Sequence, residues 1–302
     1  MKIFPTFKSI FRLIYRLVLP FFNFFIQKFE EPLLSRKLAS YGWSIDTCKN
    51  HEPGVELTVF IPVASKDTAL VRDCVYSLRD LLNHRIYEIV VCGSSNIELK
   101  ETCKILDCRY IDEVEIAPVR KSDINFQYRG SDRSGWIFQQ LVKLNVFSWA
   151  GTDHVLIWDV DTVLLQRANF EIDGDLIVEF EKHKHQPYFD NALKLLGELP
   201  EVPVGLTCHK VLFKKEILQR MLDQIERRSG EVWHQAIINS VDSRQLSSIS
   251  EYAMYSSFAM NQFPKKIKMR HWKNTSDFFP ESKRRQWILS KLFFSVSYHN
   301  HA

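Results

Sequence analysis

The residue types that most directly suggest chemistry occur at the end of one apolar run. Residues 154–158 (His-Val-Leu-Ile-Trp) are followed by Asp159 and, two residues later, by Asp161. The run predicts a buried strand, and because residues i and i+2 of a strand project to the same side, we expect the two carboxylates to converge. Two close carboxylates repel unless a proton or a cation joins them, and their oxygens suit Mg²⁺ or Mn²⁺.

The carboxylate pair also indicates a class of substrate. Mg²⁺ sites commonly combine one or two carboxylates with substrate phosphates, so Asp159 and Asp161 predict a phosphorylated donor. The alternative is a strand that ends in a polar turn, with both carboxylates merely solvated.

The composition is that of an ordinary globular protein. The chain has 302 residues, of which 45% are hydrophobic and 25% charged, and its net charge is +4. This length suffices for one domain with a large core, or for a core domain with appendages. Basic residues form no clustered runs, so we expect no nucleic-acid partner. Scattered cysteines without CxxC spacing predict reduced thiols in a protein that faces the cytosol.

Strands and helices alternate ahead of the carboxylates. The sequence predicts strands at 55–63, 87–93 and near 109–114, with a helix after the first whose apolar residues recur at i, i+3, i+4 and i+7. This alternation implies right-handed βαβ units, and therefore an α/β fold with a mostly parallel central sheet flanked by helices. Ligands of such sheets bind at the carboxyl ends of the strands, where the two carboxylates fall.

A predicted helix from about residue 134 to 150 leads directly into the carboxylate strand. Near its amino-terminal half it carries four polar side chains, those of Arg133, Gln139, Gln140 and Lys143. Arginine and lysine commonly balance a diphosphate, so these residues are candidates for donor binding. The alternative for each is a solvated helix face.

The first 30 residues differ from the rest of the chain. Their apolar residues recur at helical spacing, while Lys8, Arg12 and Arg16 fall on another face, and Pro20 is expected to interrupt the pattern. The longest uncharged run, 17–27, is too short to span a bilayer, which needs about 20 apolar residues, and no signal-peptide cleavage site follows it. We expect a helix on an anionic membrane surface; packing on the protein's own core is the alternative.

The sequence from Asp159 to residue 163, Asp-Val-Asp-Thr-Val, matches motifs of two reaction classes. One is the DxD of nucleotide-sugar glycosyltransferases with the GT-A fold. The other is the nucleophile motif of haloacid-dehalogenase-type phosphatases, in which the first aspartate attacks phosphorus. In the phosphatases this motif lies on an early strand, and an acidic pair follows a later strand. Here a complete βαβ-type region precedes the motif and no later strand ends in Asp-Asp, which favours the transferase.

Further segments occur in a specific order around the DxD. Arg-Ser-Gly-Trp at 133–136 and Gln-Gln-Leu-Val-Lys-Leu at 139–144 precede it, and Ser-Glu-Tyr at 250–252 follows it. With these segments the chain resembles GT-A enzymes over roughly residues 55–275. It resembles more closely a bacterial family of uncharacterised, predicted glycosyltransferases that carry the same segments. The ordered combination is more specific than DxD alone.

The resemblance implies roles for residues at the donor site. In GT-A enzymes the turn after the first strand often contacts the nucleotide, which implies donor contacts for Lys66 and Asp67. The DxD binds the divalent cation that bridges the donor diphosphate. This implies that Asp161 is a metal ligand, and that Asp159 is a second ligand or a partner of the ribose.

Three later residues complete the predicted site. Many GT-A enzymes add a late histidine as a metal ligand, and His271 stands in a comparable place, with His209 as the alternative. A histidine beside tryptophan is also a common structural element. An inverting transferase needs a carboxylate to deprotonate the acceptor hydroxyl, and Glu251 is our candidate. Ordinary stabilisation of a helix first turn is its alternative role.

We therefore expect a metal-dependent, hexosyltransferase-type glycosyltransferase that uses a nucleotide sugar and Mn²⁺ or Mg²⁺. The acceptor is expected to be a glycan or lipid-linked glycan of lipopolysaccharide or capsule, built on the cytoplasmic face of the inner membrane. The alternatives are a phosphatase with Asp159 as nucleophile and a catalytically inactive nucleotide- or sugar-binding module.

The same observations predict how the chain is divided. The predicted parts are a membrane-surface segment at 1–30, a linker at 31–54, a glycosyltransferase domain at 55–275 with a donor half at 55–165 and an acceptor half at 166–275, and a helical tail at 276–302.

Overall fold

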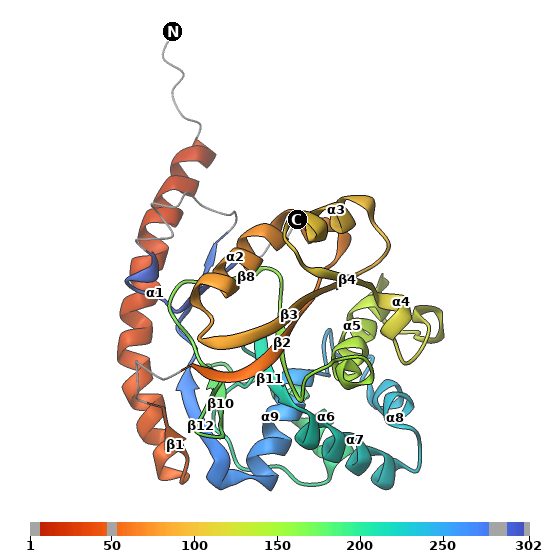
Figure 1. The fold of residues 1–302 in the computed structure, drawn as a ribbon. Coiled ribbons are helices and arrows are strands. Elements are labelled where there is room, and N and C mark those ends of the chain that lie inside the picture. Colours follow the sequence, from red (N-terminus) through yellow and green to blue (C-terminus); the bar gives the residue numbers. More distant parts are fainter. Residues whose placement is uncertain (1–6, 47–52, 278–288, 299–302) are drawn as a thin grey trace.

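The computed structural model describes residues 7–46, 53–277 and 289–298, with the backbone alone for 7–19. A five-stranded sheet in the order β11-β7-β2-β3-β4 forms its centre (Figure 1). Four strands run parallel and β11 is antiparallel to its neighbour β7. Their bounds are β2 (Gly54–Pro62), β3 (His84–Gly93), β4 (Arg109–Asp112), β7 (His154–Trp158) and β11 (Lys210–Lys214). The predicted α/β fold with a mostly parallel central sheet is confirmed.

The order of the strands creates a switch point in this sheet. From β2 the chain moves outward through β3 to β4, and it then returns to place β7 on the other side of β2. The chain that leaves β2 therefore crosses to one side of the sheet, and the chain that leaves β7 turns to the other side. Ligands of such sheets bind in the crevice between these two connections, at the carboxyl ends of the strands. The run Leu57–Ile61 of β2 is almost wholly buried, as expected of a parallel strand covered on both faces.

Helices cover the central sheet at the positions that the sequence periodicity predicts. The apolar stripe of α2 (Val71–Leu81) is fully buried at Val71, Cys74, Val75 and Leu78. The predicted helix at 134–150 is shorter than expected, because α5 (Ser134–Leu144) gives way to a 3₁₀ turn, η3 (Val146–Ser148). The other elements of this half are η1 (Ser65–Leu70), α3 (Ile97–Ile105), α4 (Glu113–Ile116), η2 (Lys121–Asp123), β5 (Gln127–Tyr128) and β6 (Ser131–Asp132).

The second half of the chain adds helices and two further sheets. One sheet has the order β1-β12-β10-β9 and the other β13-β14-β8. Their strands are β1 (Ser44–Ile45), β8 (Thr162–Leu164), β9 (Glu171–Ile172), β10 (Asp175–Phe180), β12 (Ile267–His271), β13 (Asn274–Asp277) and β14 (Ser295–Tyr298). The helices are α6 (Gln186–Leu196), α7 (Lys215–Ser229), α8 (Trp233–Ser240), α9 (Glu251–Gln262) and η4 (Pro264–Lys266).

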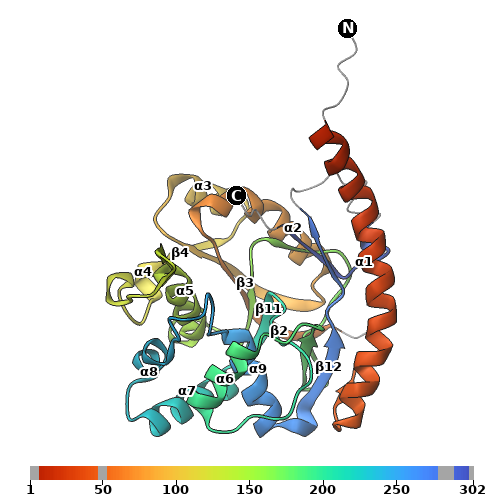
Figure 2. The ribbon, with the colours of Figure 1, turned by 180° about the vertical axis from the view of Figure 1, so that it is seen from behind.

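The first helix corrects two predictions about the amino-terminal part of the chain. α1 runs from Phe7 to Ser40 without ending at Pro20, and it lies along one side of the molecule (Figure 2). The predicted linker at 31–54 is therefore helical as far as Ser40. The helix continues because apolar residues on both sides of Pro32, among them Phe24 and Leu38, pack on the body of the protein.

The described part of the predicted helical tail also differs from expectation. Residues 295–298 form β14, which pairs with β13 and β8 and is entirely buried. The alternating Ser-Val-Ser-Tyr sequence suits a strand, since successive side chains serve opposite faces. Residues 278–288 of the predicted tail lie outside the described residues.

Candidate active site

The two aspartates lie in a tight turn at the carboxyl end of β7. The Thr162 N–H donates to the carbonyl oxygen of Asp159 over 3.0 Å, and the indole N–H of Trp158 donates to the Thr162 carbonyl oxygen over 2.7 Å. β7 ends at Trp158, so the turn, and not the alternation of a strand, places Asp159 and Asp161. The turn gives each carboxylate its own set of partners.

Asp159 is held by a buried lysine and a tyrosine. Its Oδ1 accepts from the Lys143 Nζ (2.8 Å) and from the Tyr252 hydroxyl (2.6 Å). The Lys143 Nζ also forms an ion pair with the Glu251 Oε1 at 2.7 Å. Lys143 and Glu251 are almost completely buried, whereas the Asp159 side chain is 26% exposed. These four residues, here called the Lys143 cluster, tie α5 and α9 to the turn after β7.

Charge balance within the Lys143 cluster keeps the lysine protonated. Burial alone would lower the pKa of Lys143, but the charges of Asp159 and Glu251 raise it above its ordinary value. Burial raises the pKa of Glu251, and the Lys143 ammonium opposes this shift. Burial and the charge of Asp159 together raise the pKa of Tyr252 well above its usual range, so its hydroxyl stays a donor. Gln140 supports the cluster by accepting the Glu251 backbone N–H over 3.1 Å.

Asp161 faces a histidine from the neighbouring strand region. The His209 Nδ1 is 3.9 Å from the Asp161 Oδ1, and both side chains are partly exposed. The His209 ring packs 4.9 Å from the Trp272 ring, between centroids. Of the two histidines that the sequence suggested, His209 is therefore the one beside the carboxylates.

His271 lies next to Trp272 in the chain but faces another way. Its ring packs against Phe180, with 5.4 Å between centroids, and the nearest charges that act on it include Glu31 of α1. Successive side chains at the end of a strand point to opposite faces, so the contact of Trp272 with His209 turns His271 away. The structure does not bring the predicted ligand His271 to Asp161.

A cavity of about 250 Å³ opens at the carboxyl ends of β2 and β3, beside the first turns of α5. Ser65, Ser94, Lys121 and Gln139 contribute polar groups to its wall, so the predicted donor-site residue Gln139 does face a cleft. The strands approach closely here, since a Cβ atom at Gly93 would lie only 2.6 Å from the backbone oxygen of Val63. The position of the cavity agrees with the ligand crevice of a doubly wound sheet.

The other predicted donor-site residues surround the same region. Lys66 and Asp67 lie in η1, directly after β2. Burial raises the pKa of Asp67, Lys66 lowers it, and the negative charge of Asp161 raises it further. The charge of Asp161 therefore reaches the turn after β2. Arg133 precedes α5, and its buried Nε finds no hydrogen-bond partner among the described residues.

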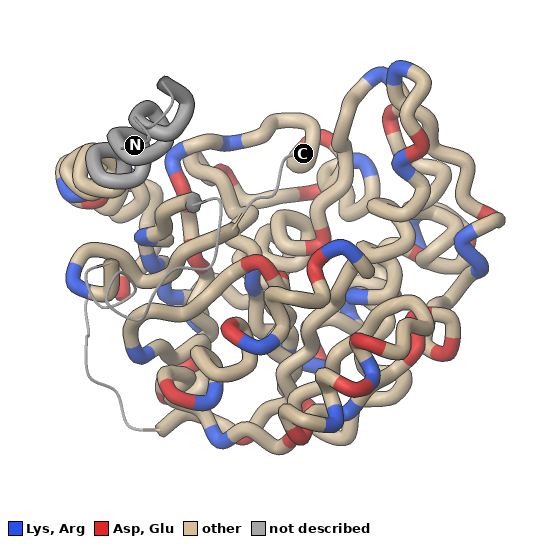
Figure 3. Tube along the Cα trace, turned by 90° about the horizontal axis from the view of Figure 1, so that it is seen from above, with Lys and Arg blue, Asp and Glu red and all other residues tan. Residues whose placement is uncertain are grey.

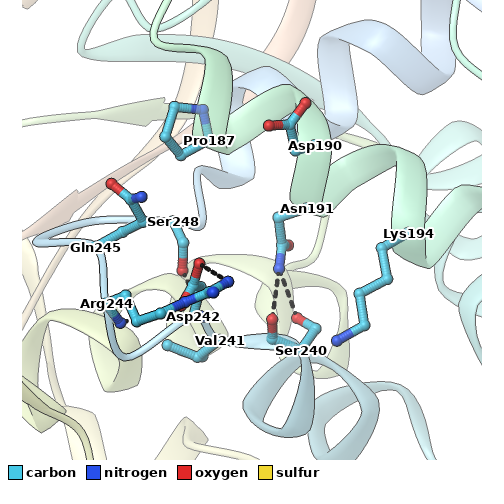
Figure 4. Close-up of a pocket in the computed structure, with 10 residues that line it drawn as sticks. All are labelled: Pro187, Asp190, Asn191, Lys194, Ser240, Val241, Asp242, Arg244, Gln245 and Ser248. Carbon is cyan, nitrogen blue, oxygen red and sulfur yellow. Dashed lines mark hydrogen bonds and ion pairs between the residues drawn. The ribbon is translucent and has the colours of Figure 1, made fainter.

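A larger cavity of about 370 Å³ lies apart from the cluster, between α6 and the segment after α8 (Figure 4). Its polar side chains largely satisfy one another. The Asn191 amide donates to the backbone and hydroxyl oxygens of Ser240, and the Arg244 guanidinium folds onto Asp242 with two hydrogen bonds. The cavity has room for a small ligand, but the paired groups indicate no particular chemistry.

The sequence did not predict a second set of buried charges behind the site. Lys210 of β11 forms an ion pair with Glu179 of β10 at 2.6 Å, and Arg270 of β12 donates to the same carboxylate at 3.0 Å. We call these three residues the Lys210 cluster. The Lys210 ammonium also lies over the rings of Trp158 and Trp272. The sequence offered little signal, since Lys210 stands at the edge of the apolar run of β11.

Comparison with known proteins identifies a family. The chain belongs to the family described as "Family of unknown function (DUF6492)", whose model matches residues 73–287. No curated protein matches the sequence. Among solved structures, the chain is similar to the galactosyltransferase LgtC in complex with donor and acceptor sugar analogues, with 10% identity, a TM-score of 0.44, and coverage of 81% of this chain and 88% of that one. It is also similar to mouse xyloside xylosyltransferase 1 in its apo form, with 10% identity, a TM-score of 0.41, and coverage of 82% and 98%.

Proposed function

We propose that this member of the DUF6492 family is a glycosyltransferase that moves a sugar from a nucleotide sugar to a glycan or lipid-linked glycan. One observation carries the proposal: the carboxylate turn at Asp159 and Asp161 follows β7, beside the switch point of the parallel sheet and the cavity at the ends of β2 and β3. Ligand crevices of such sheets form at this position, and the DxD sequence there resembles that of GT-A enzymes.

The donor atoms around Asp161 fit a divalent cation that is shared with the substrate. Asp161 and His209 offer a carboxylate and an imidazole 3.9 Å apart. In the part of the chain that the structure describes, no group of three or more His, Cys, Asp or Glu residues is arranged to hold a metal. Mg²⁺ or Mn²⁺ would therefore take further ligands from the donor diphosphate and water, as Mg²⁺ commonly does. The bound cation would stabilise the negative charge of the departing nucleoside diphosphate.

The chain's own cations support the same assignment. Arg133 has a buried Nε without a partner among the described residues, and Lys121 contributes to the wall of the cavity. The wall that holds Lys121 also includes Glu113, and Arg133 lies just before α5 and not in that wall. Guanidinium and ammonium groups bind phosphate oxygens by charge-assisted hydrogen bonds. We assign to them the binding of the diphosphate, together with Lys66 in the turn after β2.

The Lys143 cluster gives Asp159 and Glu251 different roles. Asp159 is fixed by an ammonium and a phenol yet remains partly exposed, which suits a carboxylate that accepts hydrogen bonds from a ribose or sugar hydroxyl. Glu251 is 1% exposed and paired with Lys143, so an acceptor hydroxyl has no access to it in this conformation. We therefore propose that Glu251 positions Lys143 rather than acting as the base of an inverting reaction.

The acceptor and the pathway rest on resemblance. Because the ordered segments at 133–144 and 250–252 resemble a bacterial family of predicted glycosyltransferases, we propose that the product is a cell-surface polysaccharide, such as lipopolysaccharide or capsule, made on the cytoplasmic face of the inner membrane.

A thermal-shift panel tests the donor and metal assignments. Nucleoside diphosphates are added with and without Mn²⁺ to the full chain, to Asp161→Asn and to Asp173→Asn, which makes the same change in an exposed turn elsewhere. At a hundredfold excess over the Kd, a ligand stabilises by about 2.7 kcal/mol. We expect Mn²⁺-dependent stabilisation in the wild type and in Asp173→Asn, and none in Asp161→Asn.

The same panel separates the alternatives. No response to any nucleoside diphosphate, combined with hydrolysis of p-nitrophenyl phosphate, would identify a phosphatase with Asp159 as nucleophile. Nucleotide binding without donor hydrolysis or transfer would identify an inactive binding module.

Alanine variants extend the panel to His209 and to the two histidines that follow Tyr298. The backbone N–H of Tyr298 donates to the Asp161 carbonyl oxygen over 2.7 Å. His299 and His301 themselves lie outside the described residues.

A further inference from the structure

Between Pro20 and Ser40, the part of α1 whose side chains the structure describes, one apolar face packs on the protein and a second is exposed. On the inner face Leu38 is fully buried, the Phe24 ring lies 6.3 Å from that of Phe293, and the Gln27 amide donates to the backbone of Asn274 over 2.6 Å. On the outer face six large apolar side chains are between 38% and 71% exposed. They are Phe21, Phe22, Phe25, Ile26, Phe29 and Leu33.

These six residues form one continuous band along the helix. Phe21, Phe25 and Phe29 follow one another at i, i+4 steps, which places them on one ridge of a helix that turns about 100° per residue. Leu38 of the inner face falls on roughly the opposite side. Viewed from above, α1 stands at the edge of the molecule with its outer side away from the body (Figure 3). Monomeric soluble proteins rarely leave so long an apolar band uncovered.

The charges of α1 are sorted between the two faces. Its acidic residues are Glu30 and Glu31, and both form ion pairs with the body of the protein. Glu30 pairs with Lys182, and Glu31 pairs with Lys273 at 2.7 Å. The basic residues Lys28, Arg36 and Lys37 are exposed. The outward side of the described helix therefore combines an apolar band with positive charge. The sequence of α1 before residue 20 adds three more basic residues and no acidic one.

We infer that the outer face of α1 binds the surface of an anionic lipid bilayer, with the helix axis in the plane of the membrane. Aromatic and aliphatic side chains would enter the boundary between headgroups and acyl chains, and the flanking cations would meet lipid phosphates. No helix among the described residues is long and apolar enough to cross a bilayer. This inference does not depend on the proposed transferase activity.

A second copy of the chain is a less suitable occupant of this face. The exposed band is several residues wide, whereas a two-stranded coiled coil uses a narrow seam of two positions per heptad. In a two-fold interface the same basic face of each copy, with Lys28, Arg36 and Lys37, would also lie against the other. Like charges would then repel, while an anionic membrane attracts them.

Vesicle flotation of the full chain tests the inference. The wild type is compared with the Phe25→Ser/Phe29→Ser double variant and with a matched control, Ile97→Ser/Ile105→Ser, which removes two exposed apolar side chains from α3. With vesicles that contain phosphatidylglycerol, we expect the wild type and the control to float. The affinity of the α1 variant for these vesicles should be lower by about tenfold or more. Wild-type binding should fall with added salt and with purely zwitterionic vesicles.

Several outcomes would overturn the inference. One is failure of the wild type to float with anionic vesicles, and another is an α1 variant that floats as well as the control. A third outcome is that sedimentation velocity shows a wild-type dimer without lipid and that the α1 substitutions dissociate it. The outer face would then be an interface between two copies of the chain. Unfolding temperature and the nucleotide response of each variant, measured in parallel, separate loss of membrane binding from loss of fold or of donor binding.

Discussion

Two clusters of buried charge are built on neighbouring strands of this protein, and they differ in their access to solvent. The Lys143 cluster surrounds the turn after β7 and includes one partly exposed carboxylate, Asp159. The Lys210 cluster lies behind it, where Lys210 is paired with Trp158 across the β7–β11 ladder, and its lysine and glutamate are closed off from solvent. Both join a lysine to a carboxylate, yet the Lys143 cluster exposes a carboxylate to solvent, whereas Lys210 and Glu179 are closed off.

The two clusters also differ in their balance of charge. Lys143 has two carboxylates around it, and they raise its pKa despite burial. Lys210 shares Glu179 with Arg270, and burial lowers the pKa of Lys210 despite that carboxylate. The first cluster therefore has surplus negative charge at an open edge, where a cation or hydroxyl donor can join it. The second is closed, and we assign to it a purely structural role in joining β10, β11 and β12.

The largest effect is expected where a carboxylate is removed from the closed cluster. Glu179→Ala leaves Lys210 and Arg270 buried, with Asp46 3.9 Å from the arginine as the remaining acidic partner. Breaking a buried ion pair in this way costs about 3–5 kcal/mol of unfolding free energy. Urea unfolding measures the loss. A cost below about 1 kcal/mol would refute the structural role, and the folded variant should still respond to nucleotide and Mn²⁺.

The corresponding change in the open cluster is expected to be smaller and dependent on pH. Lys143→Met should lower the unfolding free energy by about 2–3 kcal/mol at neutral pH and remove the nucleotide response. Without the ammonium, the already raised pKa of Glu251 rises further. A carboxyl group whose pKa is raised by folding stabilises the folded state fully when the pH is below the pKa of the unfolded chain. This stabilisation is lost as the pH rises through the pKa of the folded protein. The deficit should therefore be smallest near pH 4.5 and grow with pH; a constant deficit would contradict the assignment.

A tyrosine pair on α9 tests the open cluster more finely. Tyr252→Phe removes the hydroxyl that donates to Asp159 over 2.6 Å, and Tyr255→Phe removes one that accepts the Lys214 backbone N–H over 2.8 Å. Each change should cost about 1–2 kcal/mol of stability. Only Tyr252→Phe should also weaken nucleotide binding, by about tenfold, as measured by calorimetry. Equal effects of both variants on binding would show that the phenol does not position Asp159.

The smallest effect is expected for the closed lysine. Lys210→Met leaves Glu179 with its two contacts to Arg270 and puts an apolar side chain of similar length against Trp158 and Trp272. Because Glu179 keeps Arg270 as its ion-pair partner, Lys210→Met leaves no buried carboxylate unpaired, and we expect a change within about 1 kcal/mol. A loss as large as that of Lys143→Met would remove the distinction between the clusters.

Local patterns in the sequence predicted the architecture well. The apolar runs identified β2, β3 and β7, and the buried stripe of α2 is as expected. Periodicity and capping are local properties, so they are legible without tertiary information. The same local signals failed at Pro20, through which α1 continues as far as Ser40.

Long-range contacts explain what the sequence could not predict in the site. Lys143 and Glu251 were expected to act separately, as a donor ligand and a base, but they pair across 108 positions (251 − 143) because α5 and α9 both pack beside the turn after β7. The sequence could not show which of His209 and His271 lies beside Asp161. The answer depends on where each ring packs in the folded chain, against Trp272 for His209 and against Phe180 for His271.

By itself the sequence determined that two carboxylates end a buried strand of a parallel α/β sheet, and that the first helix carries phenylalanines and basic residues on separate faces. Only the tertiary structure decided that Asp159 is clamped by Lys143 and Tyr252, that Asp161 meets His209, and which face of α1 stays uncovered. The reason is physical: element type follows from short-range periodicity, whereas the partners of a charge depend on which elements the whole core brings together.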